Sequence, residues 1–324
     1  MKSINLEGSS IRKLPDLCTP NLERLNIRAC ENLIDIHEAI GSLDKLKRWD
    51  LSYCEKLQIL PSTLRLKSLE DIRLYGCVSL EKLPDLGAPN LEVLYMAGCE
   101  NLIEVHEAIG SLDKLKNWDL SNCTKLQILP STLKLKSLGF IILDGCLSLE
   151  KFPNIHPEMK CDSLDFLYCN IREWPLSLKY LSSRLFRLSL GNCQSAGDFL
   201  VSISGCKFTN LRELEVYDCD RDIIEPHDCD RDIIEPHILT EPDSFPSLEE
   251  LRIDGSNIVT IPKSIIEFTT LRELSMSNCK NLREIPRLPQ SIRRVDVSDC
   301  MSLDLPSSCG LFNQVRSLPF SLYI

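Results

Sequence analysis

A tandem ten-residue repeat brings together side chains that can bind a metal ion. The segment Asp218 to His227 is followed at once by an identical copy, Asp228 to His237. Two cysteines and two histidines are a ligand set that zinc accepts; here they are Cys219, His227, Cys229 and His237. Their spacing follows from copying the segment, and Cys219 also belongs to a regular cysteine series. We therefore expect no metal site, and we expect an acidic outer loop here.

Two histidines, each followed by glutamate, have the side chains that acid–base catalysis uses. His37 and His106 lie at the same place in two copies of one segment, Glu31 to Leu43 and Glu100 to Leu112. We expect a short helical or 3-10 turn with an exposed histidine in each copy. The sequence contains no Walker A motif, dinucleotide-binding glycine motif, nucleophile elbow or HExxH motif. We therefore expect neither enzymatic activity nor a cofactor.

The elements that position these residues follow a short repeat. The pattern is L-x-x-L-x-L-x-x-C-x-x-L-x-x-L-P, as Leu46 to Pro61 and Leu115 to Pro130 show. Its alternating part predicts a short strand with leucines inward, and strands of successive coils stack as a parallel sheet about 4.8 Å apart. In this register Trp49 and Trp118 belong to the core. The predicted coils begin at Met1, Leu22, Leu46, Leu69, Leu91, Leu115, Leu138, Cys161, Leu185, Leu211, Leu248, Leu271 and Ile292.

The repeat predicts an α/β leucine-rich-repeat solenoid of about 13 coils. A curved parallel sheet lines the concave side, and short helical, 3-10 or irregular segments form the convex side. We expect residues 1–303 to form the solenoid, with an irregular insert at 218–247. Residues 304–324 are expected to form a C-terminal tail or partial cap.

The sixteen cysteines require either disulfides, metal ions or buried thiols. Most of them recur at one position of the coil, where the side chain points inward and bonds backbone left open by the turn. We therefore expect a ladder of reduced, structural thiols, since free cysteine behaves as a small buried hydrophobe. The ladder comprises Cys30, Cys54, Cys77, Cys99, Cys123, Cys146, Cys169, Cys193, Cys219, Cys279 and Cys300.

Composition restricts the partners. The net charge of −10 and the isoelectric point near 5.2 argue against a nucleic-acid scaffold. The N-terminal residues form no apolar signal segment, and no apolar run reaches membrane length. We expect no nucleic-acid or membrane partner and a cytoplasmic location, with the nucleus as a second compartment.

The outward residues of the strands form the predicted binding surface, because solenoids bind on the concave face. Exposed aromatic and aliphatic residues bordered by charge are typical of a protein-binding patch, although single exposed apolar residues are ordinary. The predicted protein-binding residues are Tyr75, Val93, Tyr95, Phe140, Ile142, Leu167, Arg24, Arg28, Arg48 and Arg73. These residues make a basic zone of arginines and an apolar zone. A third zone, which is acidic, is expected at Glu213, Glu215, Glu250, Asp254 and Glu273.

Several segments resemble the repeat region of plant TIR–nucleotide-binding–leucine-rich-repeat disease-resistance proteins. They are Leu17 to Leu25, Cys30 to His37, Ile40 to Leu46, Leu83 to Leu86 and Ile285 to Ile292. The resemblance implies a non-catalytic recognition module of an intracellular immune receptor, which senses a pathogen effector or a host guard protein. It also implies autoinhibition and contact with a receptor's nucleotide-binding domain.

The chain itself contains no segment similar to the TIR or nucleotide-binding domains of that family. Met1 already lies in register with the repeat, which we interpret as a truncated gene product, a fragment or a gene model lacking upstream exons. The alternative function is a standalone interaction scaffold or decoy.

Overall fold

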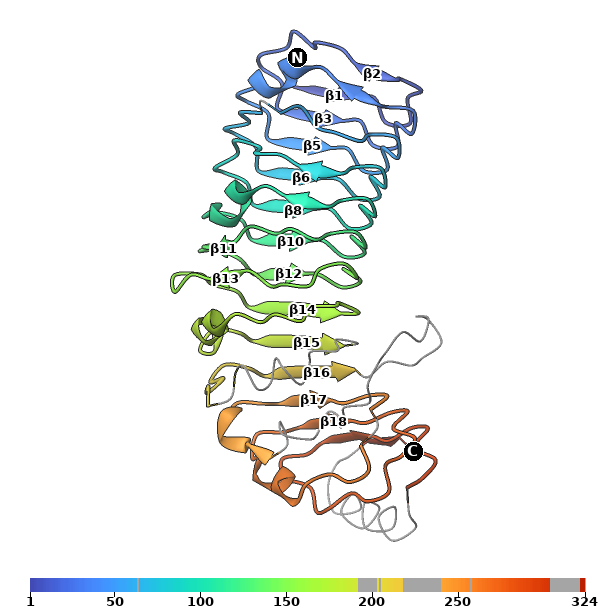
Figure 1. Cartoon of the computed structure of the whole chain (residues 1–324), viewed down its shortest axis with the longest axis vertical. Coiled ribbons are helices and arrows are strands. Elements are labelled where there is room, and N and C mark those ends of the chain that lie inside the picture. The colour runs from blue at the N-terminus through green and yellow to red at the C-terminus, as the bar shows by residue number, and fades with distance from the viewer. Residues whose placement is uncertain are drawn as a thin grey trace. The chain divides into compact units, whose positions relative to one another are not determined.

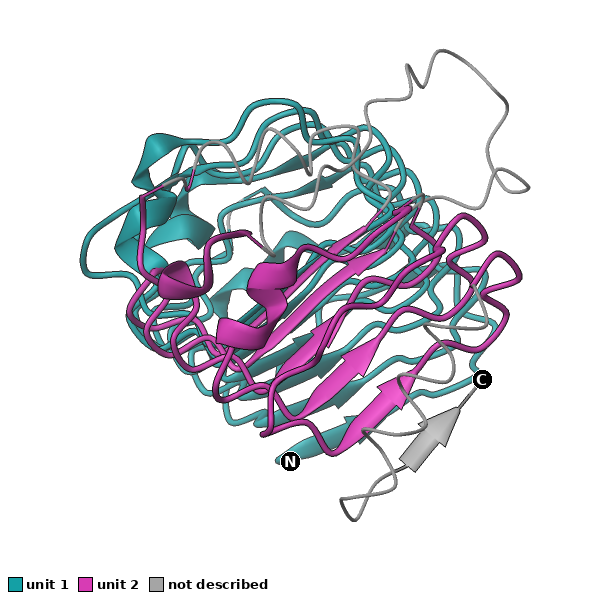
Figure 2. Ribbon diagram, turned by 90° about the horizontal axis from the view of Figure 1, so that it is seen from below, with its two compact units in different colours: residues 1–181 teal, residues 182–324 magenta. Residues whose placement is uncertain are grey.

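The computed structural model describes residues 1–62, 64–191, 203, 205–217, 240–256, 258–303 and 321–323. The chain divides into two compact units, Met1–Leu181 and Ser182–Ile324 (Figure 2). Within each unit the strands are parallel, and neighbouring coils pair through their strands.

Unit 1 is a stack of coils that each contribute one short strand to a parallel sheet (Figure 1). The strands are β1 (Ser3–Asn5), β3 (Arg24–Asn26), β5 (Arg48–Asp50), β6 (Asp71–Arg73), β8 (Val93–Tyr95), β10 (Asn117–Asp119), β12 (Phe140–Ile142) and β14 (Ser163–Leu167). The middle residue of each three-residue strand points inward: Leu25 is 1% exposed and Trp49 is fully buried. Period-two alternation therefore sets which side chains reach the core.

Unit 2 repeats this arrangement. Its strands are β15 (Arg187–Gly191), β16 (Glu213–Tyr217), β17 (Glu250–Arg252), β18 (Glu273–Ser275), β19 (Arg294–Asp296) and β20 (Ser321–Tyr323). β20 pairs with β19 in parallel, so the sheet of this unit includes a strand within the segment expected to be a tail. Residues 304–320 and the tandem decapeptide lie outside the described residues.

The other side of the coils carries short strand pairs and 3-10 helices. The pairs are β2 (Lys13–Leu14) with β4 (Asp35–Ile36), β7 (Lys82–Leu83) with β9 (Glu104–Val105), and β11 (Thr132–Leu133) with β13 (Asn154–Ile155). The 3-10 helices are η1 (Glu38–Ser42), η2 (Glu107–Ser111), η3 (Leu176–Leu181), η4 (Pro242–Ser244) and η5 (Lys263–Glu267).

The two histidines considered for catalysis cap 3-10 helices. His37 Nδ1 accepts a hydrogen bond from the Ala39 N–H at 3.1 Å, and His106 Nδ1 accepts one from the Ala108 N–H at 3.2 Å. An N-terminal cap satisfies a backbone donor that the helix leaves open. Both histidines therefore have a structural role, and both are exposed as expected.

The predicted leucine-rich-repeat solenoid is confirmed. Every predicted coil start lies two residues before a strand, from Met1 before β1 to Ile292 before β19. Among the described residues, the helices are too short and too polar to cross a membrane.

Candidate functional site

In each unit the outward residues of the strands form a surface, which we call the strand face: the first, third and fifth residues counted from each strand start. In unit 1 these residues stack in register from coil to coil. Arg24 lies opposite Arg48, which lies opposite Asp71, and Val93 lies opposite Asn117, which lies opposite Phe140. A ligand on this face therefore meets side chains from several coils at once.

Some strand-face side chains accept hydrogen bonds from backbone N–H groups of the same coil. The carboxylate of Asp50 accepts a hydrogen bond from the Ser52 N–H at 2.9 Å, and Asp119 accepts the equivalent bond from Ser121 at 2.9 Å. Asn26 does the same for the Arg28 N–H at 3.0 Å. These Asx turns end the strand and lead into the turn that follows.

Two of the four predicted arginines already have partners. Arg73 donates to both carboxylate oxygens of Asp71, at 3.1 and 3.0 Å, and Asp71 raises the pKa of Arg73. Arg28 lies 4.0 Å from a Glu7 carboxylate oxygen, and its guanidinium lies 5.0 Å from the centre of the Tyr53 ring.

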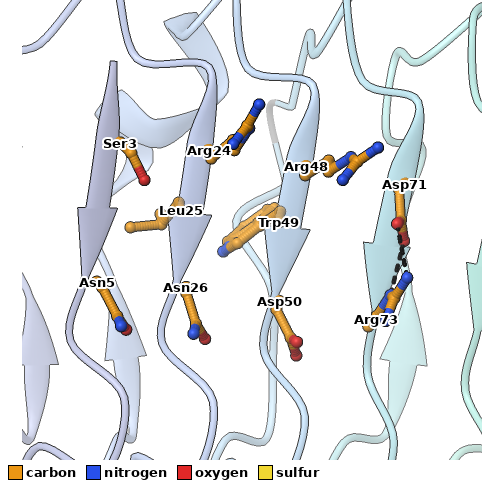
Figure 3. A pocket seen from close by; sticks show the side chains of 10 residues that line it. All are labelled: Ser3, Asn5, Arg24, Leu25, Asn26, Arg48, Trp49, Asp50, Asp71 and Arg73. Atoms are coloured by element: carbon orange, nitrogen blue, oxygen red, sulfur yellow. Dashed lines mark hydrogen bonds and ion pairs between the residues drawn. The ribbon is translucent and has the colours of Figure 1, made fainter. Parts of the chain in front are cut away.

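The other two arginines, Arg24 and Arg48, are exposed. No ion pair or hydrogen bond of either guanidinium occurs among the interactions described within unit 1. Both side chains project from the strand face over an open hollow of about 320 Å³ (Figure 3). The backbone-anchored Asp50 and the Asp71–Arg73 pair lie beside them in the same hollow.

The six predicted apolar residues are half-buried, and they do not form one continuous patch. Tyr75 and Tyr95 stack with ring centroids 5.3 Å apart, and burial raises the pKa of Tyr75 to about 12. Strand β10 separates this pair from Phe140 and Ile142 on β12. Leu167 lies at the fifth position of β14.

Two exposed aromatic residues, Tyr53 and Tyr168, were missed in the sequence; they follow the fifth strand-face position at the turn after β5 and β14. Tyr53 is 44% exposed and has a φ of 62°, a left-handed conformation that is unusual for a bulky residue. Its ring covers Gly76, where an added Cβ would lie 2.8 Å from the Tyr53 Cδ1 atom. The sequence signal is a tyrosine at a turn position where neighbouring coils have Ala29, Gly76 or Gly98.

The described ladder cysteines are buried or half-buried, and they are free thiols. The Sγ of Cys54 donates to the Ile27 carbonyl at 3.2 Å, and that of Cys77 donates to the Leu51 carbonyl at 3.2 Å. The same bond to the preceding coil occurs at Cys30, Cys99, Cys123, Cys146, Cys169, Cys279 and Cys300. Cys193 and Cys219 lie outside the described residues. Reduction of the ladder in the cell stays a prediction.

The expected acidic zone of unit 2 is largely paired. Glu215 is only 7% exposed and accepts hydrogen bonds from Arg187 at 2.8 Å and Ser189 at 3.1 Å. Arg187 also pairs with Glu213 at 3.2 Å. Burial and the adjacent carboxylates of Glu273 and Glu213 raise the pKa of Glu250. This zone is therefore not a free acidic surface.

The described residues include no group of His, Cys, Asp and Glu side chains arranged to hold a metal ion. The cysteines and histidines of the tandem decapeptide lie outside the described residues, so the expectation about them stays untested.

The fold and the strand face define the chain as a leucine-rich-repeat module. It is 15% identical to the APL1 leucine-rich repeat domain, with a TM-score of 0.55 over 97% of this chain and 84% of that one. It matches a chain of the Toll–Spatzle complex with a TM-score of 0.51 and 16% identity, over 92% of this chain and 47% of that one. These likenesses establish the fold alone.

The sequence relatives are plant disease-resistance proteins. The chain is 32% identical to disease resistance-like protein DSC1 of Arabidopsis thaliana over 88% of its length, and 31% identical to disease resistance protein RPP4 of the same plant over 86%. It is 28% identical to TMV resistance protein N of Nicotiana glutinosa over 94%. The matches cover 22%, 22% and 26% of these relatives, so the chain spans about a quarter of their length or less. No family model matches.

The homologues of this chain are thus plant TIR-NB-LRR disease-resistance proteins, and the resemblance predicted from the sequence is confirmed.

Proposed function

We propose that the chain is a non-catalytic protein-recognition module of a plant intracellular immune receptor. Its strand face in unit 1 binds a pathogen effector or a host guard protein, and the module holds the receptor inactive until then. The cytoplasm, with the nucleus as a second compartment, is its place of action. The resistance-protein relatives support the immune role.

The stacked Tyr75–Tyr95 pair carries the proposal of protein binding. Two stacked aromatic rings 5.3 Å apart offer rigid contact area, which is the character of residues that dominate interface energies. Phe140 and Ile142 add a second apolar contact beyond β10. Residues 1–303 act as the repeat domain in this proposal, and residues 304–324 act as a C-terminal tail or partial cap.

The test is capture of a partner from infected plant tissue by the intact chain and by the double variant Tyr95→Ala/Phe140→Ala. We expect the variant to lose capture while its circular-dichroism spectrum stays unchanged, because both residues are only half-buried. The matched control is Ile59→Ala/Ile128→Ala, which removes exposed apolar side chains, 63% and 49% exposed, outside the strand face. Equal capture by the Tyr95/Phe140 variant and the intact chain would overturn the proposal.

The alternative is a standalone scaffold or decoy that competes with full-length receptors for the same partner. It predicts a transcript that encodes the repeats alone. A transcript joining TIR and nucleotide-binding exons to this sequence would favour the receptor instead.

A further inference from the structure

Unit 1 contains two copies of the same three-coil block. Residues 20–84 correspond to residues 89–153, and most positions are identical. The inward residues of the three strands are the same in both copies: Leu25 and Leu94, Trp49 and Trp118, Ile72 and Ile141. The histidine caps His37 and His106 are also the same. Both copies therefore present a strand face on one common framework.

The strand face is where the two copies differ most. Within the first copy, Asp50 and Ser52 are the only strand-face residues that recur in the second, as Asp119 and Ser121. Their recurrence has a structural reason, since these residues form the Asx turns that end the strand. The other strand-face positions changed their chemistry; Arg24, Arg48 and Arg73 correspond to Val93, Asn117 and Ile142. One framework thus carries four arginines on the strand face of the first copy, whereas the strand face of the second copy has none and is mainly apolar, with Asp119 and Asp144 as its charged residues.

The first copy places two like charges side by side. Arg24 and Arg48 lie directly opposite each other in the register of β3 and β5, and like charges at such positions destabilise a sheet. Asp71 lies opposite Arg48 on the other side, but both its carboxylate oxygens accept hydrogen bonds from Arg73. The second copy shows that Val and Asn fit these positions, so the framework does not require arginine there.

We propose that Arg24 and Arg48 form a carboxylate-binding subsite for an acidic segment of a protein partner, an inference that rests on the proposed function. A guanidinium donates two parallel hydrogen bonds to a carboxylate, and two guanidinium groups on neighbouring strands can hold one carboxylate between them. The half-buried Asn26 lines the same hollow at the other end of the strand, in a row with Asn5 and Asp50 (Figure 3), and its amide donates to Glu7 at 3.1 Å. Leu25 and Trp49 line the hollow beneath.

The overall charge makes this subsite easy to recognise in an experiment. A chain with a net charge of −10 repels an acidic peptide in general, so binding of such a peptide requires a local basic site. The probe is a fluorescein-labelled peptide of alternating glutamate and alanine, measured by fluorescence anisotropy against the whole chain at low salt. A second peptide with glutamine in place of glutamate measures the contribution of the carboxylates.

The test variant is Arg24→Val/Arg48→Asn, which installs the residues of the second copy at both positions. We expect it to bind the glutamate peptide about tenfold more weakly, a change of about 1.4 kcal/mol, with an unchanged melting temperature or a slightly higher one. The glutamine peptide should bind neither protein. The control Lys45→Ala/Lys56→Ala removes the same charge from exposed residues outside the strand face, and its affinity should match that of the intact chain.

Equal binding of the glutamate peptide by the Arg24/Arg48 variant and the intact chain would overturn the inference, as would an equal loss in the Lys45/Lys56 control. Neither result depends on the apolar residues Tyr95 and Phe140, which test the proposed function. If the Tyr95/Phe140 variant still loses partner capture while the arginine variant binds the peptide normally, the proposed function stands and the carboxylate subsite does not. If the intact chain and all the variants capture the partner equally, the proposed function is overturned, and the carboxylate subsite, which rests on it, is overturned as well.

Discussion

At the scale of the residue, the ladder cysteines close a gap that the repeat leaves in its own backbone. Each coil turns after its strand, and a carbonyl of the preceding coil faces the interior there. Cys77 lies in this place and donates its S–H to the Leu51 carbonyl at 3.2 Å while being fully buried. The thiol combines a small apolar volume with one weak donor, which is what this position requires.

Replacing Cys77 with alanine should therefore lower the free energy of unfolding by about 1–3 kcal/mol, because the buried Leu51 carbonyl loses its partner. Urea denaturation followed by circular dichroism measures the change. Cys18 is the natural control because it is exposed and lies outside the ladder, and Cys18→Ala should leave stability unchanged. Equal stability of the Cys77 variant and the intact chain would show that the thiol hydrogen bond contributes nothing.

At the scale of the element, the duplicated 3-10 helices η1 and η2 each begin with a histidine that caps the helix in the same way. His106 accepts the Ala108 N–H, and His37 accepts the Ala39 N–H in the other copy. A histidine can act in this way only through an unprotonated Nδ1.

His106→Ala should cost about 1 kcal/mol of stability, the usual effect of losing a helix cap. His106→Asn should restore most of it, because asparagine is a good cap and also offers an acceptor. Thermal unfolding of the two variants measures both effects. His37→Ala should behave like His106→Ala; a cost at only one of the two sites would contradict a shared capping role.

The strands and the core could be predicted from the sequence because both depend on local alternation. Leu25 and Trp49 are inward by their place in the repeat, and the structure buries them. Which of the strand-face arginines form an ion pair within the chain could not be predicted in this way. Arg73 pairs with Asp71 of its own strand, whereas Arg48, which lies opposite the same carboxylate, does not; that choice depends on side-chain rotamers, which the repeat pattern does not encode.

The same limit applies to the acidic zone. The pattern places Glu215 outward, yet Arg187 and Arg252 of the neighbouring strands cover it. The repeat pattern also does not mark Tyr53, because it leaves the residue type at the turn after each strand unspecified.

At the scale of the whole molecule, the buried thiols couple stability to alkaline pH. Burial raises the pKa of Cys77 from 9.0 to about 12, and burial likewise raises the pKa values of Cys54 and Cys146. Between the unfolded and folded pKa values, the unfolded chain releases protons that the folded chain keeps. The free energy of unfolding then falls as pH rises.

We therefore expect the melting temperature to be insensitive to these thiols below pH 9.0 and to fall progressively between pH 9.0 and about 12. Thermal denaturation across this range, with a reducing agent present, measures the effect. The Cys77→Ala variant should show a shallower fall than the intact chain, since it has one buried thiol fewer. A parallel fall in both proteins would assign the loss to other groups.

The in-register stacking of the strands has a consequence for how such a chain can change its length. Because each coil pairs with the next through the same backbone positions, deleting or copying whole coils brings equivalent edges together and keeps the hydrogen-bonding pattern intact. The copied block at residues 89–153 adds three coils, about 14 Å of sheet at the usual strand spacing. Recombination between coils can thus lengthen the sheet while its hydrogen-bonding pattern stays intact, and the strand face of the added coils can then diverge, as it has between the two copies here.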